Sequence, residues 1–429
     1  MWALLRRNRL PAFIASVELP VVLAIAPALL FPTPRRLVVL SVIPVLWVSA
    51  GLSGRRFIPK TPMNAGIGLL LAMVGVSLFV TADVLFSLGK VSGVVLGVLL
   101  FWAITRWLNT PNRLKAATIA FVLTGATLSV AGLIGADWGI YTYFNYKVEA
   151  FRRVAQSLPR VISGVPGAEA GFNQNAVAGC LVLFIPLQIA LLTANVGSWL
   201  LPVSKSRWPA RWLVVLQVLL IALTTGGVLL MQSRGAWMGL VVATVAFLIW
   251  YRPRTRLFAV AVTLAVAVLL LVFSMQRAYD LSVSPWGPDM ARARTVSGRV
   301  EVWSKAIETI RHFPLTGIGM NVFRTVVPVV HAHNHLLQAA LDLGLPGLVA
   351  YLSLWLVAFS LLTIVYRRSN ETIYCAIAGG LGAGLVAHFV FSLADAIPLG
   401  AKAGSLFWIT LAFTVGLHRI ARSVPREQD

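Results

Sequence analysis

The sequence predicts an all-helical integral membrane protein that forms a single polytopic domain over residues 1–429. Two observations predict this class: 58% of the residues are hydrophobic, and only 12% are charged. In addition, the apolar residues are grouped into long runs that short polar segments separate. Soluble domains are not built from such a composition, and long apolar runs are typical of transmembrane helices.

The apolar runs predict about 12 transmembrane helices of roughly 20 residues each. The first run follows a basic N-terminal stretch and lacks a small-residue cleavage site, so we expect a membrane anchor there rather than a cleavable signal peptide. The predicted spans centre on Leu19–Phe31, Leu37–Gly51, Ile67–Val80, Val91–Ala103, Ala117–Leu133, Val177–Thr193, Leu213–Leu230, Trp237–Trp250, Phe258–Phe273, Leu348–Val365, Ile373–Phe391 and Leu406–Leu417.

The basic residues between the spans predict the orientation of the chain. Arg and Lys are enriched in cytoplasmic loops, and alternating spans place more than half of the 36 basic residues on one side. Both termini are then cytoplasmic, and Arg35 and Arg36 are the only basic pair in a short outer loop. Because this bias explains much of the net charge of +22, we expect no nucleic-acid partner. The other basic residues lie mainly in two long outer segments, where anionic membrane lipids or phosphates would balance their charge.

The first long outer segment, residues 135–174, contains an aromatic group and then an amphipathic stretch at Val148–Leu158. Phe151, Val154 and Leu158 fall on one helical face, and Arg152 and Arg153 fall on another. This pattern predicts a helix at the membrane interface. A more specific hypothesis is that Arg152 and Arg153 bind a lipid headgroup.

The second long outer segment, residues 276–345, predicts two short helices. The first helix follows Ser297, a favourable N-cap residue, and ends before Pro314. The second helix, Leu336–Leu343, follows Asn334 as its N-cap, and Gly344 and Pro346 close it.

Three of the six histidines lie within five residues, at His331, His333 and His335. His333 precedes the predicted cap, where backbone N–H groups and the helix dipole favour phosphate oxygens and a neutral imidazole. A neutral imidazole there can act as a general base, whereas each histidine taken alone is more often a surface loop residue. A metal site is the weaker alternative, because no neighbouring carboxylate or cysteine completes a ligand set in the sequence. We therefore expect base catalysis with no metal or other cofactor.

Two arginines are candidates for phosphate binding. Arg234 lies in a tight outer turn between two spans, and Arg299 falls in the first turn of the predicted loop helix. A guanidinium group can grip a phosphate with two parallel hydrogen bonds, although snorkelling toward the membrane surface is the structural alternative.

Ionisable residues within the spans raise a second possibility, that of a proton-coupled transporter. His388, Ser392 and Asp395 share a helix face by their spacing, and Glu18 lies in the first span. The stripe has no counterpart in the other half of the chain, and hydrogen bonds that hold the helices together are an equally good account of it.

Four sequence blocks, taken in order, resemble the O-antigen ligase and polymerase superfamily. They are Phe172-Asn173-Gln174-Asn175 leading to Pro186; Ser233-Arg234-Gly235-Ala236-Trp237; Ser297-Gly298-Arg299 with Trp303, Pro314, Gly317 and Gly319; and His331-Ala332-His333-Asn334 with Leu337, Gly344 and Gly347. The likeness extends over roughly residues 172–350, and Asp342 departs from it because the family often has glutamate there.

The resemblance implies a GT-C-like, metal-independent glycosyltransferase of the bacterial inner membrane whose active site faces the periplasm. It implies an undecaprenyl-diphosphate-linked glycan donor and a lipid A–core acceptor. His333 matches the catalytic histidine, with His331 as a close rival, and Arg234 and Arg299 match arginines that bind the diphosphate. Asn334 completes the expected substrate-binding set. A ligase is the preferred member, an O-antigen polymerase is the alternative, and a lipid-linked-sugar flippase or transporter is the alternative from another class.

Overall fold

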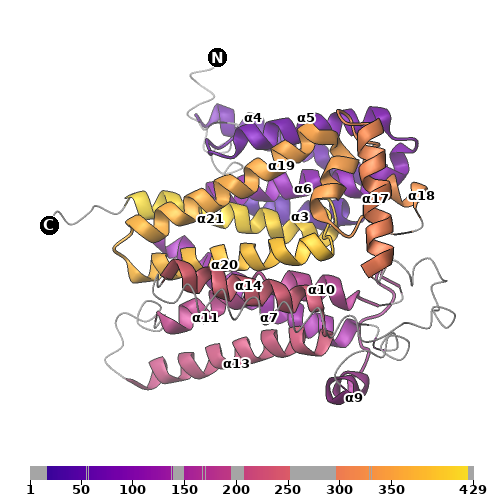
Figure 1. Cartoon of the computed structure of the whole chain (residues 1–429). Helices are drawn as coiled ribbons and strands as arrows, with labels where there is room; N and C mark the ends of the chain where they lie inside the picture. Colours follow the sequence, from indigo (N-terminus) through magenta and orange to yellow (C-terminus); the bar gives the residue numbers. More distant parts are fainter. Residues whose placement is uncertain are drawn as a thin grey trace.

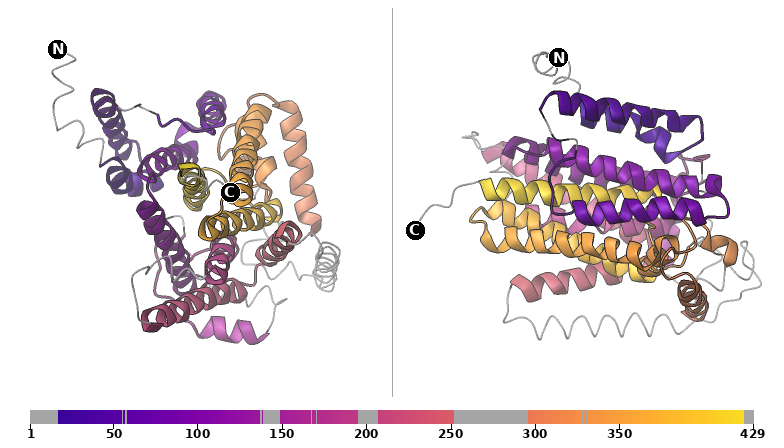
Figure 2. Two further views of the ribbon diagram at one scale, coloured as in Figure 1. Left: turned by 90° about the vertical axis from the view of Figure 1, so that its left-hand side faces the viewer. Right: turned by 90° about the horizontal axis from the view of Figure 1, so that it is seen from above.

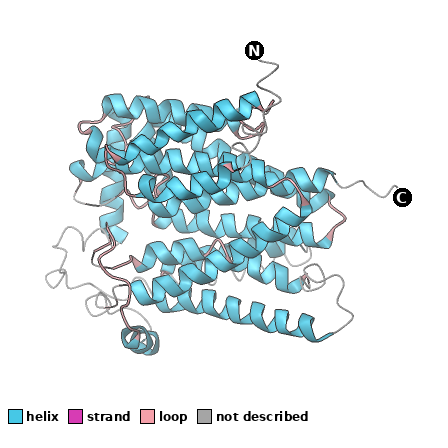
Figure 3. Cartoon of the chain, turned by 180° about the vertical axis from the view of Figure 1, so that it is seen from behind, coloured by secondary structure: helices cyan, strands magenta, loops and turns pink. Residues whose placement is uncertain are grey.

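A computed structural model describes residues 17–54, 56, 58–136, 138, 149–166, 168–169, 171–194, 207–251, 296–327, 329 and 331–423. This part of the chain is helical and contains no β-strand, only two isolated β-bridges (Figure 3). The helices are α3 (Glu18–Leu30), η1 (Arg36–Ser41), α4 (Val42–Leu52), α5 (Asn64–Val80), α6 (Val84–Trp107), α7 (Pro111–Gly135), α9 (Glu149–Ser157), α10 (Gln174–Leu181), α11 (Ile185–Thr193), α13 (Arg207–Met231), α14 (Arg234–Tyr251), α17 (Val296–His312), α18 (Phe323–Val326), α19 (His335–Arg368), α20 (Thr372–Ala394), η4 (Lys402–Gly404) and α21 (Ser405–Ser423).

Seven helical segments of the described chain are long and apolar enough to cross a membrane, and four shorter apolar helices accompany them. The predicted all-helical membrane class is therefore confirmed. The predicted number of about 12 spans remains a prediction, because the span expected at Phe258–Phe273 lies outside the described residues. The cytoplasmic location of both termini likewise stays a prediction.

One predicted span is interrupted. The run Val177–Thr193 forms α10 and α11, with a turn between Leu181 and Ile185. Pro186 lies in the first turn of α11. Proline has no backbone N–H to donate to the preceding turn, so it suits the start of a helix better than its interior.

The long helices lie side by side, and α17 crosses one end of this bundle (Figures 1 and 2). Helix α20 lies between α14, α11 and α19, and it packs closely against the first two. A Cβ atom at Gly239 of α14 would lie 2.3 Å from the backbone oxygen of Ala387, and one at Gly384 would lie 2.5 Å from that of Leu183. These glycines allow backbones to approach closely, as small residues commonly do between membrane helices. This packing fixes the position of α20 in the bundle, and therefore the place of its C-terminal end.

The histidine loop leads into α19. Asn334 is the N-cap of this helix, because its Oδ1 accepts hydrogen bonds from the backbone N–H groups of Leu336 at 2.9 Å and Leu337 at 3.1 Å. Gly344, with a φ of 69°, breaks the helical backbone and separates a short first helix from the long one. The predicted short helix with its Asn334 cap is thus confirmed.

The predicted cap at Ser297 is wrong. Helix α17 already includes Val296, so Ser297 lies inside its first turn. A cap is worth about 1 kcal/mol, a preference that tertiary packing can override. The helix ends at His312, before Pro314, as the sequence predicts.

Candidate active site

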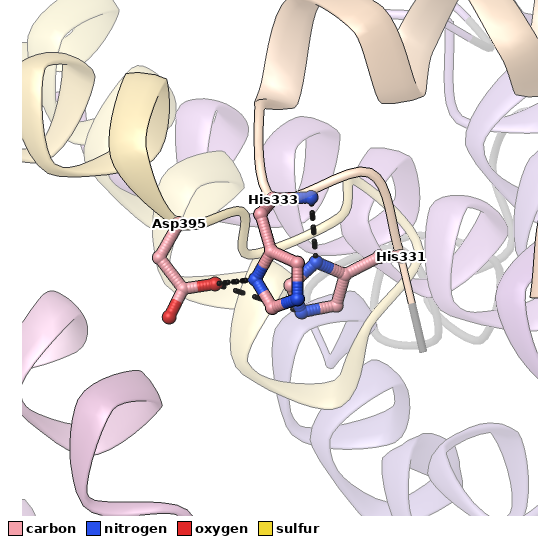
Figure 4. Close-up of side chains that lie close together, drawn as sticks. All are labelled: His331, His333 and Asp395. Carbon is pink, nitrogen blue, oxygen red and sulfur yellow. Dashed lines mark hydrogen bonds and ion pairs between the residues drawn. The ribbon is translucent and has the colours of Figure 1, made fainter. Parts of the chain in front are cut away.

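His333, in the loop before α19, and Asp395, directly after α20, lie side by side (Figure 4). The Nδ1 atom of His333 lies 2.8 Å from the Oδ1 atom of Asp395. If the neutral ring donates its proton from Nδ1 to the carboxylate, its Nε2 atom keeps a lone pair. An imidazole oriented in this way can accept a proton at Nε2, and the carboxylate stabilises the cation that forms.

His331 binds the backbone of His333. Its Nδ1 atom accepts a hydrogen bond of 3.1 Å from the backbone N–H of His333, and its Nε2 atom lies 3.8 Å from Asp395 Oδ1 (Figure 4). Burial lowers the pKa of His331 to about 3, although the charge of Asp395 opposes this shift. His331 is therefore neutral near pH 7, as its accepting role at Nδ1 requires.

Asp395 is not part of a helical stripe with His388 and Ser392, which corrects the sequence prediction. Helix α20 ends at Ala394, and Asp395 has an extended backbone with φ −152° and ψ 136°. Its side chain therefore turns to the histidine loop. His388 instead binds the backbone oxygen of Gly179 at 2.9 Å, which ties α20 to α10, while Ser392 is buried.

The carboxylate of Asp395 is held in its charged form. Burial by itself would raise its pKa, but the hydrogen bond and electrostatic interaction with His333, together with the positive charge of Arg299, bring the pKa below the usual range. A buried carboxylate of this kind is retained because it is hydrogen bonded and paired.

The second oxygen of Asp395 connects two further sequence blocks to the site. Asn175 donates from Nδ2 to Asp395 Oδ2, and the hydroxyl of Ser233 donates to Asn175 Oδ1. The same hydroxyl accepts a hydrogen bond of 3.3 Å from the backbone N–H of Ala236, in the first turn of α14. The hydroxyl of Ser233 therefore has two roles: it caps the helix that begins at Arg234, and it binds Asn175.

The two candidate arginines lie in the first turns of α14 and α17. Arg234 is the first residue of α14, it is half-buried, and it follows the predicted tight turn, in which Gln232 has a φ of 48°. Arg299 lies in the first turn of α17 and donates from a guanidinium nitrogen to the backbone oxygen of Ala394. Because Ala394 precedes Asp395, the structure brings Arg299 to the His333–Asp395 pair. Arg234 follows Ser233, which Asn175 links to Asp395.

The remaining candidates have other positions. Arg153 is exposed on α9, which packs against α13, and the side chain of Arg152 lies outside the described ones. Asn334 caps α19 and also donates from Nδ2 to the backbone oxygen of Leu393 at 3.2 Å. Its amide therefore joins the histidine loop to the end of α20.

His335 leaves the cluster and enters the bundle. It is 3% exposed, and its Nδ1 atom lies 2.9 Å from the hydroxyl oxygen of Tyr351. The rings of Trp355 and Phe389 also contact it edge-on. The site therefore uses two of the three clustered histidines.

Among the described residues, His331, His333 and Asp395 also form a group that could hold a metal ion, with ligand atoms all within 4.8 Å of one another. The expectation that no carboxylate completes a ligand set is thus wrong, because Asp395 comes from a distant part of the chain. Two imidazoles and one carboxylate are a known ligand set for a catalytic divalent metal.

Sequence reasoning missed the pairing of Asp395 with His333 and did not single out Lys90. Lys90 lies near the start of α6, 12% exposed, with its Nζ atom 3.6 Å from Asp342 Oδ2. A lysine within an apolar run of span length was the available signal.

Fold and site together define a protein whose described residues are helical, with seven helical segments long and apolar enough to cross a membrane and a His–Asp pair beside Arg299. Residues 218–352 match the family model described as O-antigen ligase. This range contains Arg234, Arg299, His331 and His333, so the resemblance predicted from the sequence is confirmed over this part of the chain. The block at residues 172–175 lies outside the matched range. No curated protein matches the chain.

Proposed function

We propose that the chain is an O-antigen ligase of the bacterial inner membrane. It transfers a glycan from undecaprenyl diphosphate to a sugar of lipid A–core at the periplasmic face. The observation that carries this proposal is the hydrogen bond between His333 and Asp395, with Arg299 bound beside it. The family match over residues 218–352 supports the class of reaction.

The proposed reaction needs one base. A hydroxyl oxygen of the acceptor sugar attacks the anomeric carbon of the glycan and gives its proton to Nε2 of His333. The bond between the anomeric carbon and the diphosphate oxygen breaks, and the diphosphate leaves with the electron pair. A single direct displacement inverts the anomeric centre. Asp395 stabilises the imidazolium ion that forms, since its carboxylate stays charged.

The leaving diphosphate needs positive charge that is already in place. Arg234 and Arg299 are proposed to bind its oxygens, whose charge grows as the bond breaks. Arg299 starts from a half-buried position against the end of α20, so it needs little reorganisation. Arg152, Arg153 and Asn334 are proposed to help to bind the lipid-linked substrate, and lipid headgroups are the proposed partners of the exposed α9.

The site bears differently on the two alternatives to a ligase. An O-antigen polymerase would use the same base and the same arginines, so the site does not separate it from a ligase. A lipid-linked-sugar flippase or proton-coupled transporter would need an intramembrane relay. The bond from His388 to Gly179 and the pairing of Asp395 with His333 leave that reading with less support.

Lipopolysaccharide from a strain that lacks this gene tests the proposal. A ligase null should produce rough lipopolysaccharide, while long polymer accumulates on the undecaprenyl carrier. Core capped by a single repeat unit would identify a polymerase instead. Repeat units trapped on the cytoplasmic side would identify a flippase. Wild-type lipopolysaccharide restored by the plasmid-borne gene is the control.

A further inference from the structure

Ala332, between the two site histidines, has both of its backbone polar groups bound by side chains. Gln338 Oε1 accepts a hydrogen bond of 2.8 Å from the N–H of Ala332, and Trp303 Nε1 donates one of 3.0 Å to its carbonyl oxygen. Ala332 is fully buried, and the next residue, His333, has a φ of 51°. A non-glycine residue in the left-handed region needs support from its surroundings, and these two bonds supply it.

The amide of Gln338 is oriented by a buried carboxylate. Its Nε2 group donates a hydrogen bond of 2.8 Å to Asp342 Oδ1, which also accepts one of 3.2 Å from the backbone N–H of Asn321. An ionised carboxylate only accepts hydrogen bonds, so the NH₂ group must face Asp342. The oxygen of Gln338 must then face Ala332, whose backbone N–H group is the donor.

Lys90 balances the charge of Asp342. Their side chains are 12% and 5% exposed, and the Nζ atom lies 3.6 Å from Oδ2. A buried carboxylate without such a partner would be strongly unfavourable. The cation therefore favours the charged, acceptor form of Asp342 that orients Gln338.

We infer that Lys90, Asp342 and Gln338 form a positioning network that holds the turn of His331–His333 in the conformation in which His333 contacts Asp395. The network runs from α6, through the first turns of α19, to the backbone of Ala332. None of its three side chains is assigned to the substrate. They are positioning residues, and they act through the histidine turn.

The inference rests on the proposed function only where turnover is concerned. Its structural part predicts that the two site histidines become more accessible when the network is broken. Diethyl pyrocarbonate modifies neutral imidazole nitrogens, and peptide mass spectrometry gives a rate for each histidine in the purified full-length protein. His418, near the end of α21, serves as the internal reference.

Gln338→Met removes both amide hydrogen bonds and keeps the length of the side chain. Modification of His331 and His333 should accelerate about tenfold, because a lost buried hydrogen bond shifts local opening by about that factor. His418 should keep its wild-type rate. Gln188→Met is the matched control, since Gln188 is also buried and its amide bonds to Thr224 on α13.

A second pair of variants tests the charge. Lys90→Met leaves a buried carboxylate without its cation and should also accelerate modification of both histidines. Adding Asp342→Asn removes that unpaired charge but keeps an oxygen for Gln338 and Asn321, so the rates should return toward wild type. Lys90→Arg should resemble wild type. The Lys90 variants suffice if Gln338→Met does not fold.

Wild-type modification rates in folded Gln338→Met or Lys90→Met protein would overturn the inference. An equal acceleration at His418 would also overturn it, because it would indicate general loosening of the bundle. In the transferase assay, Gln338→Met should lower kcat and leave KM for the lipid-linked donor near its wild-type value. If the wild-type protein shows no transfer at all, the proposed function fails, while the modification rates still decide the inference.

Discussion

His333 contacts Asp395 across a sequence separation of 62 residues, with Nδ1 of the imidazole 2.8 Å from Oδ1 of the carboxylate. The other carboxylate oxygen accepts from Asn175, which Ser233 holds in turn. Asp395 thus joins the histidine loop to the sequence blocks that contain Asn175 and Ser233. The imidazole can present only Nε2 to a substrate as long as Nδ1 remains bound in this way.

The first prediction concerns the carboxylate. In Asp395→Asn, an amide NH₂ group that faces His333 favours the tautomer with its proton on Nε2, which cannot act as the base. An NH₂ group that faces Asn175 instead opposes the donor of that residue. Turnover should fall about 10²- to 10⁴-fold, as when the carboxylate of a Ser-His-Asp triad becomes an amide. Transfer of lipid-linked glycan in isolated membranes measures the loss. Glu301→Gln, an exposed change on α17, is the control, and wild-type turnover in Asp395→Asn would refute a role for this carboxylate.

The second prediction separates the two site histidines. His333→Ala should lower turnover about 10²- to 10⁴-fold, the usual contribution of a general base. His331→Ala should have a smaller effect, because His331 acts through the backbone N–H of His333. Donor binding and membrane insertion should survive in both variants. If His331→Ala is the more damaging change and His333→Ala retains turnover, the base is His331.

The third prediction concerns the arginines. Arg234→Lys and Arg299→Lys keep the positive charge but lose the planar fork that binds two phosphate oxygens. Each should lower kcat/KM for the diphosphate-linked donor about 10- to 100-fold, the value of one or two charged hydrogen bonds. Arg311→Lys, in the last turn of α17, is the matched control. Normal kinetics in both lysine variants would favour a topological role.

The fourth prediction addresses metal. The group His331, His333 and Asp395 has the composition of a three-ligand metal site, yet the proposed mechanism uses His333 as a free base. Treatment of the purified protein with EDTA, followed by removal of the chelator, should leave transfer unchanged. Loss of activity that Zn²⁺ restores would instead assign the three residues to a metal, and His333 could then not act as the base. Metal analysis of the purified protein gives an independent check.

Much of the fold follows from the sequence because membrane helices can be predicted from residues that are close together in the chain. Apolar runs of span length, the Asn334 cap and the tight turn before Arg234 each depend on residues close together in the chain. The break between α10 and α11 was missed, although Pro186 marked it. The cap at Ser297 was misplaced because a cap preference is weak beside packing.

The sequence alone determined the membrane class, most helical segments, the histidine cluster and the two arginines. Only the tertiary structure decided which carboxylate joins His333, that His335 turns into the bundle, and that Lys90 and Gln338 support the loop. The physical reason is that periodicity describes neighbours within one helix. The helix-face reading of Asp395 failed because α20 ends one residue earlier. Where that end meets the histidine loop depends on close backbone packing at Gly239 and Gly384, between helices far apart in the chain.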